Sequence, residues 1–99
     1  MKIIFKEGDA PAIVEKIKAQ LAGRKLGEMV SFSLNGKDLE VTIKKLGTSS
    51  LKFTDESKNG SIQWNLTSEK IAFAHKAFKD DVLEKITKVV NQVGGSVSA

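Results

Sequence analysis

Apolar and polar residues alternate along the middle of the chain, between residues 29 and 66. An alternation of period two predicts β-strands with one buried face. Two Asn-Gly dipeptides, Asn35-Gly36 and Asn59-Gly60, separate successive alternating segments. Asn and Gly tolerate the positive φ angles of two-residue hairpin turns. The sequence therefore predicts an antiparallel meander with strands over residues 29–34, 38–44, 51–55 and 61–66.

The first dipeptide predicts the register of its hairpin. A two-residue turn at Asn35-Gly36 pairs Phe32 with Leu39 and Val30 with Val41. The apolar faces of the two strands then coincide, whereas a slip of one residue would turn every side chain to the opposite face.

The second dipeptide predicts pairs of Phe53 with Leu66 and of Asp55 with Trp64. Trp64 belongs to the inward-facing positions of its strand, so we expect it in the core instead of on a binding surface. Residues 55–61 are polar and are expected to project as an exposed tip.

The two ends of the chain predict a strand and two helices. Residues 2–6 are typical of a short strand, and Pro11 suits the first turn of a helix over residues 11–22. Apolar residues at helical spacing form its buried stripe: Ala10, Ile13, Val14, Ile17 and Leu21. A second helix is expected over residues 81–93, with Val82, Ile86, Val89, Val90 and Val93 on its apolar face. Gly94-Gly95 ends it.

Residues 67–78 permit two interpretations. Ile71, Ala74 and Phe78 continue the apolar stripe of the last helix towards the N-terminus. Alternatively, residues 70–76 alternate as a fifth meander strand, and the helix begins near Asp80, which suits a helix start. We favour the strand followed by the helix, and we keep the single long helix as the alternative interpretation.

Together these elements predict an α+β fold. We expect a two-layer sandwich in which an antiparallel meander sheet of four or five strands is covered on one face by two helices, in the order β-α-β-β-β-β-(β)-α. Residues 1–95 form a single domain, and residues 96–99 are expected to be a disordered C-terminal tail.

Composition excludes several classes of protein. Hydrophobic residues make up 40% of the 99 residues and charged residues 28%, which are ordinary globular values. The chain has no cysteine, which removes disulfides, thiol catalysis and cysteine-based metal sites. The apolar run Ile3-Ile4-Phe5 is too short for a signal peptide or a transmembrane helix, so we expect a cytoplasmic protein.

The positive charge is carried almost entirely by lysine. The net charge is +4, and Arg24 is the only arginine among 16 basic residues. Arginine is preferred for contacts to phosphate and to bases, so this composition favours a solvated lysine-rich surface. If the chain binds an anionic partner, Lys16, Lys18, Arg24 and Lys25 of the first helix and the following loop are the candidate contacts.

No residue pattern predicts a catalytic, cofactor or metal site, and we expect a protein that is not an enzyme. His75 is the only histidine, and we interpret it as a surface or rim residue. Asp55-Glu56 lie on a strand, where neighbours point to opposite faces, and Asp80-Asp81 suit a helix start. The outer sheet face carries no aromatic residue on which bases could stack.

Three segments resemble the small bacterial polyhydroxyalkanoic acid system proteins, a family linked to storage granules. These are residues 2–21, the strand at 39–43, and a late strand that leads through Phe78 into the helix at 82–90. The resemblance implies an accessory or interaction domain whose partner is a storage granule or another protein, as a monomer or a homodimer. The order of elements is also similar to that of ribosome-hibernation factors, which implies weak RNA or ribosome binding as the alternative.

Overall fold

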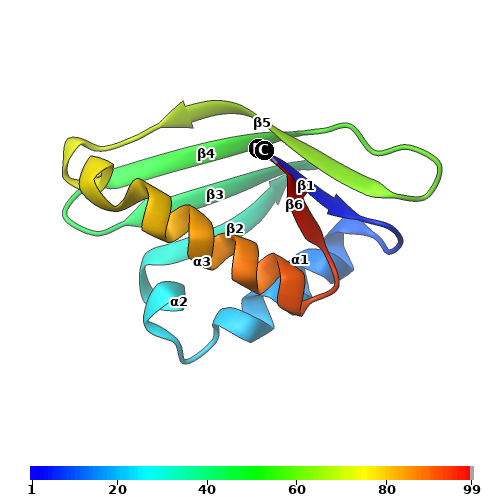
Figure 1. The fold of residues 1–99 in the computed structure, drawn as a ribbon, viewed down its shortest axis with the longest axis horizontal. Coiled ribbons are helices and arrows are strands. Elements are labelled where there is room, and N and C mark those ends of the chain that lie inside the picture. Colours follow the sequence, from blue (N-terminus) through cyan, green and yellow to red (C-terminus); the bar gives the residue numbers. More distant parts are fainter. Residues whose placement is uncertain (99) are drawn as a thin grey trace.

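The computed structural model describes residues 1–98, without the side chains of residues 26 and 78. One layer is a six-stranded antiparallel sheet and the other layer is formed by helices, as the sequence predicts, although the sheet has more strands than expected (Figure 1). In chain order the elements are β1 (Lys2–Phe5), α1 (Ala10–Leu21), α2 (Lys25–Met29), β2 (Val30–Asn35), β3 (Asp38–Lys44), β4 (Thr48–Asp55), β5 (Ile62–Lys70), the 3₁₀-helix η1 (Phe73–Phe78), α3 (Lys79–Gln92) and β6 (Ser96–Ser98). The strand order in the sheet is β2-β3-β4-β5-β1-β6.

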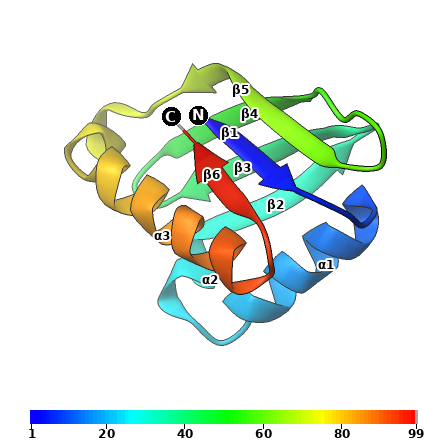
Figure 2. The same ribbon diagram turned by 45° about the vertical axis from the view of Figure 1, so that its right-hand side comes forward.

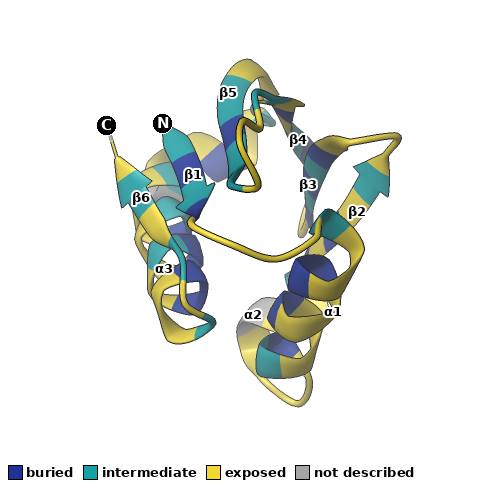
Figure 3. Cartoon of the chain, turned by 90° about the vertical axis from the view of Figure 1, so that its right-hand side faces the viewer, coloured by how far each residue is buried: buried dark blue, intermediate teal, exposed yellow. Residues whose placement is uncertain are grey.

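The sheet is curved, and its concave face is covered by α1 and α3. Figure 3 shows the buried faces of both helices turned inward, with β2 and β3 on one side and β1 and β6 on the other. The N-terminus of α1 is capped by Asp9, whose carboxylate accepts a hydrogen bond from the Ala12 N–H at 3.0 Å. Within residues 1–98, no helix has both the length and the apolar character needed to span a membrane.

The buried faces of both helices are those the sequence predicts. On α1 the buried residues are Ile13, Val14, Ile17 and Leu21. On α3 they are Val82, Ile86, Val89 and Val90. The opposite face of α3 carries the ion pairs Lys85–Asp81 and Lys88–Glu84, at 3.1 Å and 3.8 Å.

The first hairpin corrects the predicted register by two residues. Phe32 pairs with Val41 instead of Leu39, and Val30 pairs with Ile43. The central turn residues are Gly36 and Lys37, and only Gly36 has a positive φ, 65°. This pattern fits a type II′ turn, which needs glycine only at its first central position. Because the shift is an even number of residues, the inward-facing side chains are unchanged.

The second hairpin has the predicted register. Phe53 pairs with Leu66 and Asp55 pairs with Trp64. Asn59 and Gly60 both have positive φ, 50° and 82°, as a type I′ turn requires. Residues 57–60 are exposed at the end of this hairpin.

The strand predicted over residues 70–76 is wrong. A shift of register between Lys52 and Phe53 leaves Thr67 as an extra residue in β5, and pairing with β4 continues as far as Lys70. Residues 68–70 continue β5 along β4 without a reversal of the chain, and β1 occupies the other edge of β5, so no separate fifth meander strand forms. Residues Phe73–Phe78 are a 3₁₀-helix that leads into α3, which is closer to the helical alternative. The side chain of Phe78 lies outside the described part.

The tail predicted at residues 96–99 also requires correction. Residues Ser96–Ser98 form β6, which pairs with β1, while Ala99 lies outside the described residues. Gly95 makes this return possible, because a Cβ atom there would lie 2.6 Å from Cζ of Phe5 and 2.7 Å from Cγ1 of Val90. The C-terminal segment therefore completes the sheet (Figure 2).

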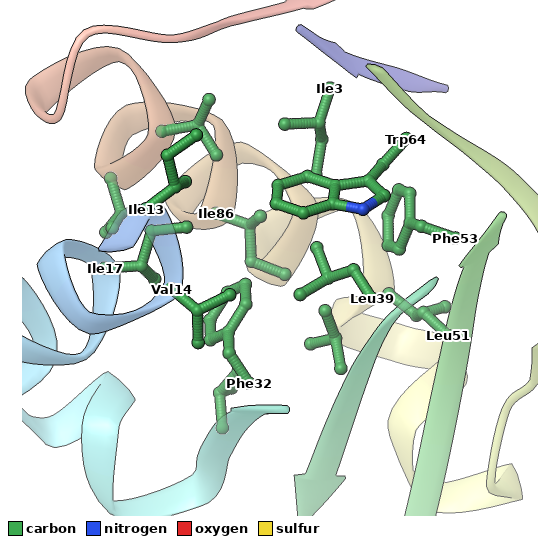
Figure 4. Packing of buried hydrophobic residues seen from close by; sticks show 14 of the residues in the cluster. Ile3, Ile13, Val14, Ile17, Phe32, Leu39, Leu51, Phe53, Trp64 and Ile86 are labelled. Carbon is green, nitrogen blue, oxygen red and sulfur yellow. The ribbon is translucent and has the colours of Figure 1, made fainter. Parts of the chain in front are cut away.

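The core lies between the sheet and the two long helices. Trp64 has no exposed surface, as predicted, and its indole Nε1–H donates to the carbonyl of Lys37 at 2.9 Å. Figure 4 shows Ile86 of α3 and Val14 of α1 pointing into the same cluster as Trp64. The ring of Phe5 contacts Trp64 edge to face, with centroids 6.3 Å apart.

Candidate anion-binding site

His75 lies in the interior, which corrects its interpretation as a surface histidine. Its side chain is 1% exposed, and its Nδ1 lies 2.5 Å from Oγ of Ser49, a residue with no exposed surface. Its Nε2 lies 2.5 Å from the carbonyl oxygen of Lys45. Oγ of Ser49 also accepts a hydrogen bond from the Ala72 N–H at 2.7 Å. We call these four residues the histidine bracket.

The histidine bracket joins three segments of the chain. Lys45 lies in the β3–β4 connection, Ser49 lies at the start of β4, and Ala72 and His75 follow β5. The Nε2 atom faces a carbonyl oxygen, so it carries a proton and donates. A serine nucleophile needs contact with its substrate. Ser49 is enclosed, so the bracket is a structural support for the β3–β4 connection.

Sequence reasoning missed the bracket because Ser49 and Lys45 lie 26 and 30 residues from His75. One signal was present. Ser49 continues the inward alternation of Leu51 and Phe53, so it occupies a buried position of β4. A buried hydroxyl needs a hydrogen-bond partner.

The two residues of the first carboxylate pair have different partners, although β4 ends at Asp55 and Glu56 lies just beyond the strand on which it was predicted. Asp55 accepts hydrogen bonds from the N–H and the hydroxyl of Ser57, whereas Glu56 forms an ion pair with Lys2 at 3.3 Å. Asp80 and Asp81 occupy the first turn of α3. Within residues 1–98, no three His, Asp or Glu side chains are grouped so that they could hold a metal ion.

A basic cleft of about 450 Å³ lies between α2, the end of β3 and α3. Its lining consists of Lys25, Glu28, Met29, Lys44, Lys45 and Lys85. Lysines from three separate segments therefore surround one hollow that contains a single glutamate. A hollow in which one sign of charge predominates raises the local concentration of counter-ions, so this cleft is suited to an anion.

Three of the cleft lysines are not neutralised. Lys85 pairs with Asp81 at 3.1 Å. Among the side chains that the structure describes, no carboxylate lies within salt-bridge distance of Lys25, Lys44 or Lys45. These three ammonium groups are thus available to an anionic partner.

The cleft contains only part of the candidate set predicted from the sequence. Lys25 lines it, and Arg24 lines an adjoining hollow that shares Lys85. Lys18 lies beside Arg24 in another hollow and forms an ion pair with Glu15 at 3.7 Å. Lys16 lines a hollow formed with β1 and the segment after α3, so it does not join this site.

The residues that sequence reasoning missed are Lys44, Lys45 and Lys85. The doublet Lys44-Lys45 at the end of a predicted strand was a visible signal. The doublet becomes part of a binding site only through α2, which brings Lys25 beside it. The sequence pattern did not predict this five-residue helix.

Two large apolar side chains stand out beside the cleft. Leu46 and Phe73 are each 90% exposed, whereas the other large hydrophobic side chains that the structure describes are buried or half-buried. Leu46 follows Lys45, and Phe73 follows Ala72. A Cβ atom at Gly47 would lie 3.2 Å from Cβ of Ala72, so the two segments are in contact. We call Leu46 and Phe73 the apolar tip.

Comparison of the chain with protein-family models, with curated proteins and with solved structures returned no match of any of the three kinds.

Proposed function

We propose that this protein is a small non-enzymatic interaction domain that binds an anionic partner through the basic cleft. The observation that carries this proposal is the convergence of Lys25, Lys44 and Lys45 around one hollow without carboxylate partners. The histidine bracket supports a non-enzymatic role, because its hydroxyl and imidazole are enclosed and engaged in holding the chain. A cytoplasmic location belongs to the same proposal.

Charge reversal in the cleft tests this proposal. We expect the double variant Lys44→Glu/Lys45→Glu to bind labelled inorganic polyphosphate at least about tenfold more weakly than the parent protein at low salt, because two attractive contacts become repulsive. Fluorescence anisotropy measures the affinity.

The matched control is Lys37→Glu/Lys58→Glu, which makes the same change of net charge in the two hairpin turns at the opposite end of the sheet. We expect this control to weaken binding by less than about threefold, since lysines in these two turns do not contact an anion held in the cleft and change only its long-range attraction. An equal loss in both double variants would show that binding follows net charge alone, and the cleft would then not be the site.

RNA is the second candidate partner, because Arg24 and Lys25 lie beside the lysines of β3 and α3. RNA is supported if the logarithm of the affinity for a single-stranded RNA oligonucleotide falls linearly with the logarithm of the salt concentration, and if this binding requires Lys44 and Lys45. Absence of RNA binding at low salt would remove it. The resemblance to granule-linked proteins favours a granule surface or a protein over RNA.

A further inference from the structure

We infer that the anionic partner is a lipid surface, and that the apolar tip inserts into it while the lysines around the basic cleft contact the headgroups. This inference rests on the proposed function and adds the chemical class of the partner. It follows from three features at one end of the sheet: two exposed apolar side chains, the positive charge around them, and the backbone that holds them.

The apolar tip is unusual because its exposure has no role in the fold. Leu46 and Phe73 are each 90% exposed, although aliphatic and aromatic side chains stabilise a fold by being buried. Such side chains, when flanked by lysines, are typical of segments that enter the boundary between headgroups and acyl chains. Figure 1 shows η1 and the β3–β4 connection at the same end of the sheet, which allows both residues to meet one surface.

The backbone at Leu46 is strained. Leu46 has φ 56°, in the left-handed region that disfavours residues with a Cβ atom. Asn or Gly would adopt this conformation more readily. The chain therefore places a large apolar residue where it neither packs nor suits the backbone. Strain of this kind points to a function for the side chain that causes it.

The histidine bracket fixes the geometry of the tip. The carbonyl of Lys45, next to Leu46, bonds to His75, and the N–H of Ala72, next to Phe73, bonds to Ser49. Both exposed residues are thus adjacent to backbone groups held by the same buried pair. Insertion of a rigid loop requires little ordering on binding, which favours affinity.

The charge around the tip is positive. Lys44 and Lys45 precede Leu46, and Lys76 lies with its Nζ 5.9 Å from the ring centroid of Phe73. Lys79 pairs with Glu69 at 2.9 Å, and Asp80 and Asp81 lie at the start of α3. Lysines close to a membrane surface attract anionic lipid headgroups, with an effect of roughly fivefold in affinity for each residue.

These features favour lipid over RNA. RNA-binding surfaces stack successive bases on several aromatic rings. The apolar tip offers only the ring of Phe73, because the side chain of Leu46 is aliphatic. A lipid layer accepts both side chains and neutralises the lysines at once.

Vesicle co-sedimentation tests the inference. We expect the parent protein to bind vesicles of phosphatidylcholine mixed with phosphatidylglycerol, and to bind pure phosphatidylcholine at least about tenfold more weakly, since the charge contribution is then absent. Leu46→Asn and Phe73→Ser should each weaken binding to the mixed vesicles by about tenfold. Both variants should bind polyphosphate within about twofold of the parent protein, because the cleft lysines are retained.

Two variants separate insertion from a loss of folding. Leu46→Asn places a residue that tolerates positive φ at the strained position, so we expect its denaturation midpoint to equal or exceed that of the parent protein. Phe73→Trp keeps a large aromatic ring, so it should retain vesicle binding, and its emission should shift to shorter wavelength when mixed vesicles are added. Trp64 is fully buried and provides a constant background.

The outcomes distinguish the two proposals. If Leu46→Asn and Phe73→Ser bind mixed vesicles as well as the parent protein, the insertion of the tip is wrong while the anionic site stands. If the parent protein binds RNA or polyphosphate but no vesicle, or if the tip variants abolish only self-association, lipid is the wrong partner. If the parent protein binds no anionic probe at low salt, the proposed function fails as well.

Discussion

At the scale of single residues, Ser49 and His75 show how a small fold satisfies polar groups in its interior. Oγ of Ser49 accepts a hydrogen bond from the Ala72 N–H and bonds to Nδ1 of His75, whose Nε2 reaches the carbonyl of Lys45. A buried polar group that keeps its hydrogen bonds adds to stability, whereas one that loses a partner carries the full cost of desolvation. The pair therefore ties the β3–β4 connection and the start of β4 to η1 and to the residue before it.

Replacement of Ser49 tests this role. We expect Ser49→Ala to lower the free energy of unfolding by about 1–3 kcal/mol, because the Ala72 N–H loses its acceptor and His75 loses one hydrogen bond in the interior. Urea denaturation measures the change. Ser50→Ala is the control, since Ser50 is the next residue of β4 and only half-buried, and it should change stability by less than about 0.5 kcal/mol. Equal effects of the two substitutions would contradict the structural role of the bracket.

At the scale of elements, the terminal strand β6 depends on one glycine. The chain leaves α3, and β6 returns beside β1, so that Ser96 pairs with Ile4 and Val97 pairs with Ile3. The passage is narrow because Gly95 lies against the ring of Phe5 and the side chain of Val90. Both of these side chains are buried, so neither can withdraw without disturbing the core.

A methyl group at Gly95 should displace these neighbours. We expect Gly95→Ala to destabilise the fold by about 1–3 kcal/mol, the usual effect of overpacking. In the double variant Phe5→Leu/Gly95→Ala the loss should be smaller than the sum of the two single losses, because the smaller side chain makes room for the methyl group. Ser96→Ala, at an exposed position of β6, is the control. Additive losses in the double-mutant cycle would show that the contact with Phe5 does not limit this position.

At the scale of the whole molecule, both ends of the chain meet in the sheet. β1 lies between β5 and β6, so the N-terminal strand is interior to the sheet and is held by pairings with residues far along the sequence. The radius of gyration is 12.7 Å, close to the value of about 13 Å expected for a compact chain of this length. We therefore expect the helices and all six strands to unfold as one cooperative unit.

This organisation predicts two-state unfolding. Trp64 is the only tryptophan and is fully buried against residues of β1, β3 and β4. We expect its fluorescence and the far-ultraviolet circular dichroism to follow one transition in urea, with the same midpoint. A fluorescence change at clearly lower urea concentration than the loss of secondary structure would show instead that the core opens before the helices and strands unfold.

Local patterns were sufficient for much of the fold. The alternation in β2 to β5 and the stripes of α1 and α3 identified the buried face of each of these elements. The second hairpin has the predicted register, since Asn59 and Gly60 both occupy the positive-φ positions of their turn. At the first hairpin the same dipeptide did not determine the register, because Gly36 alone takes a positive φ and the turn moves on to Lys37.

The candidate site could be predicted only in part. Arg24 and Lys25 were identified from the sequence, but Lys44, Lys45 and Lys85 join them through α2 and the packing of α3. The exposure of Leu46 and Phe73 could not be predicted either, because an isolated apolar residue has the same sequence pattern whether tertiary packing buries it or leaves it exposed.

The sequence by itself determined which side of the four central strands and of the two long helices is apolar, because the periodicity of side chains along a strand or helix is a local property of the backbone. Only the tertiary structure decided the pairing of β6 with β1, the burial of His75 and the placement of the cleft lysines beside the apolar tip. These features depend on contacts between segments far apart in the chain. Their free energies depend on the packing of the whole molecule, and no short stretch of sequence contains them.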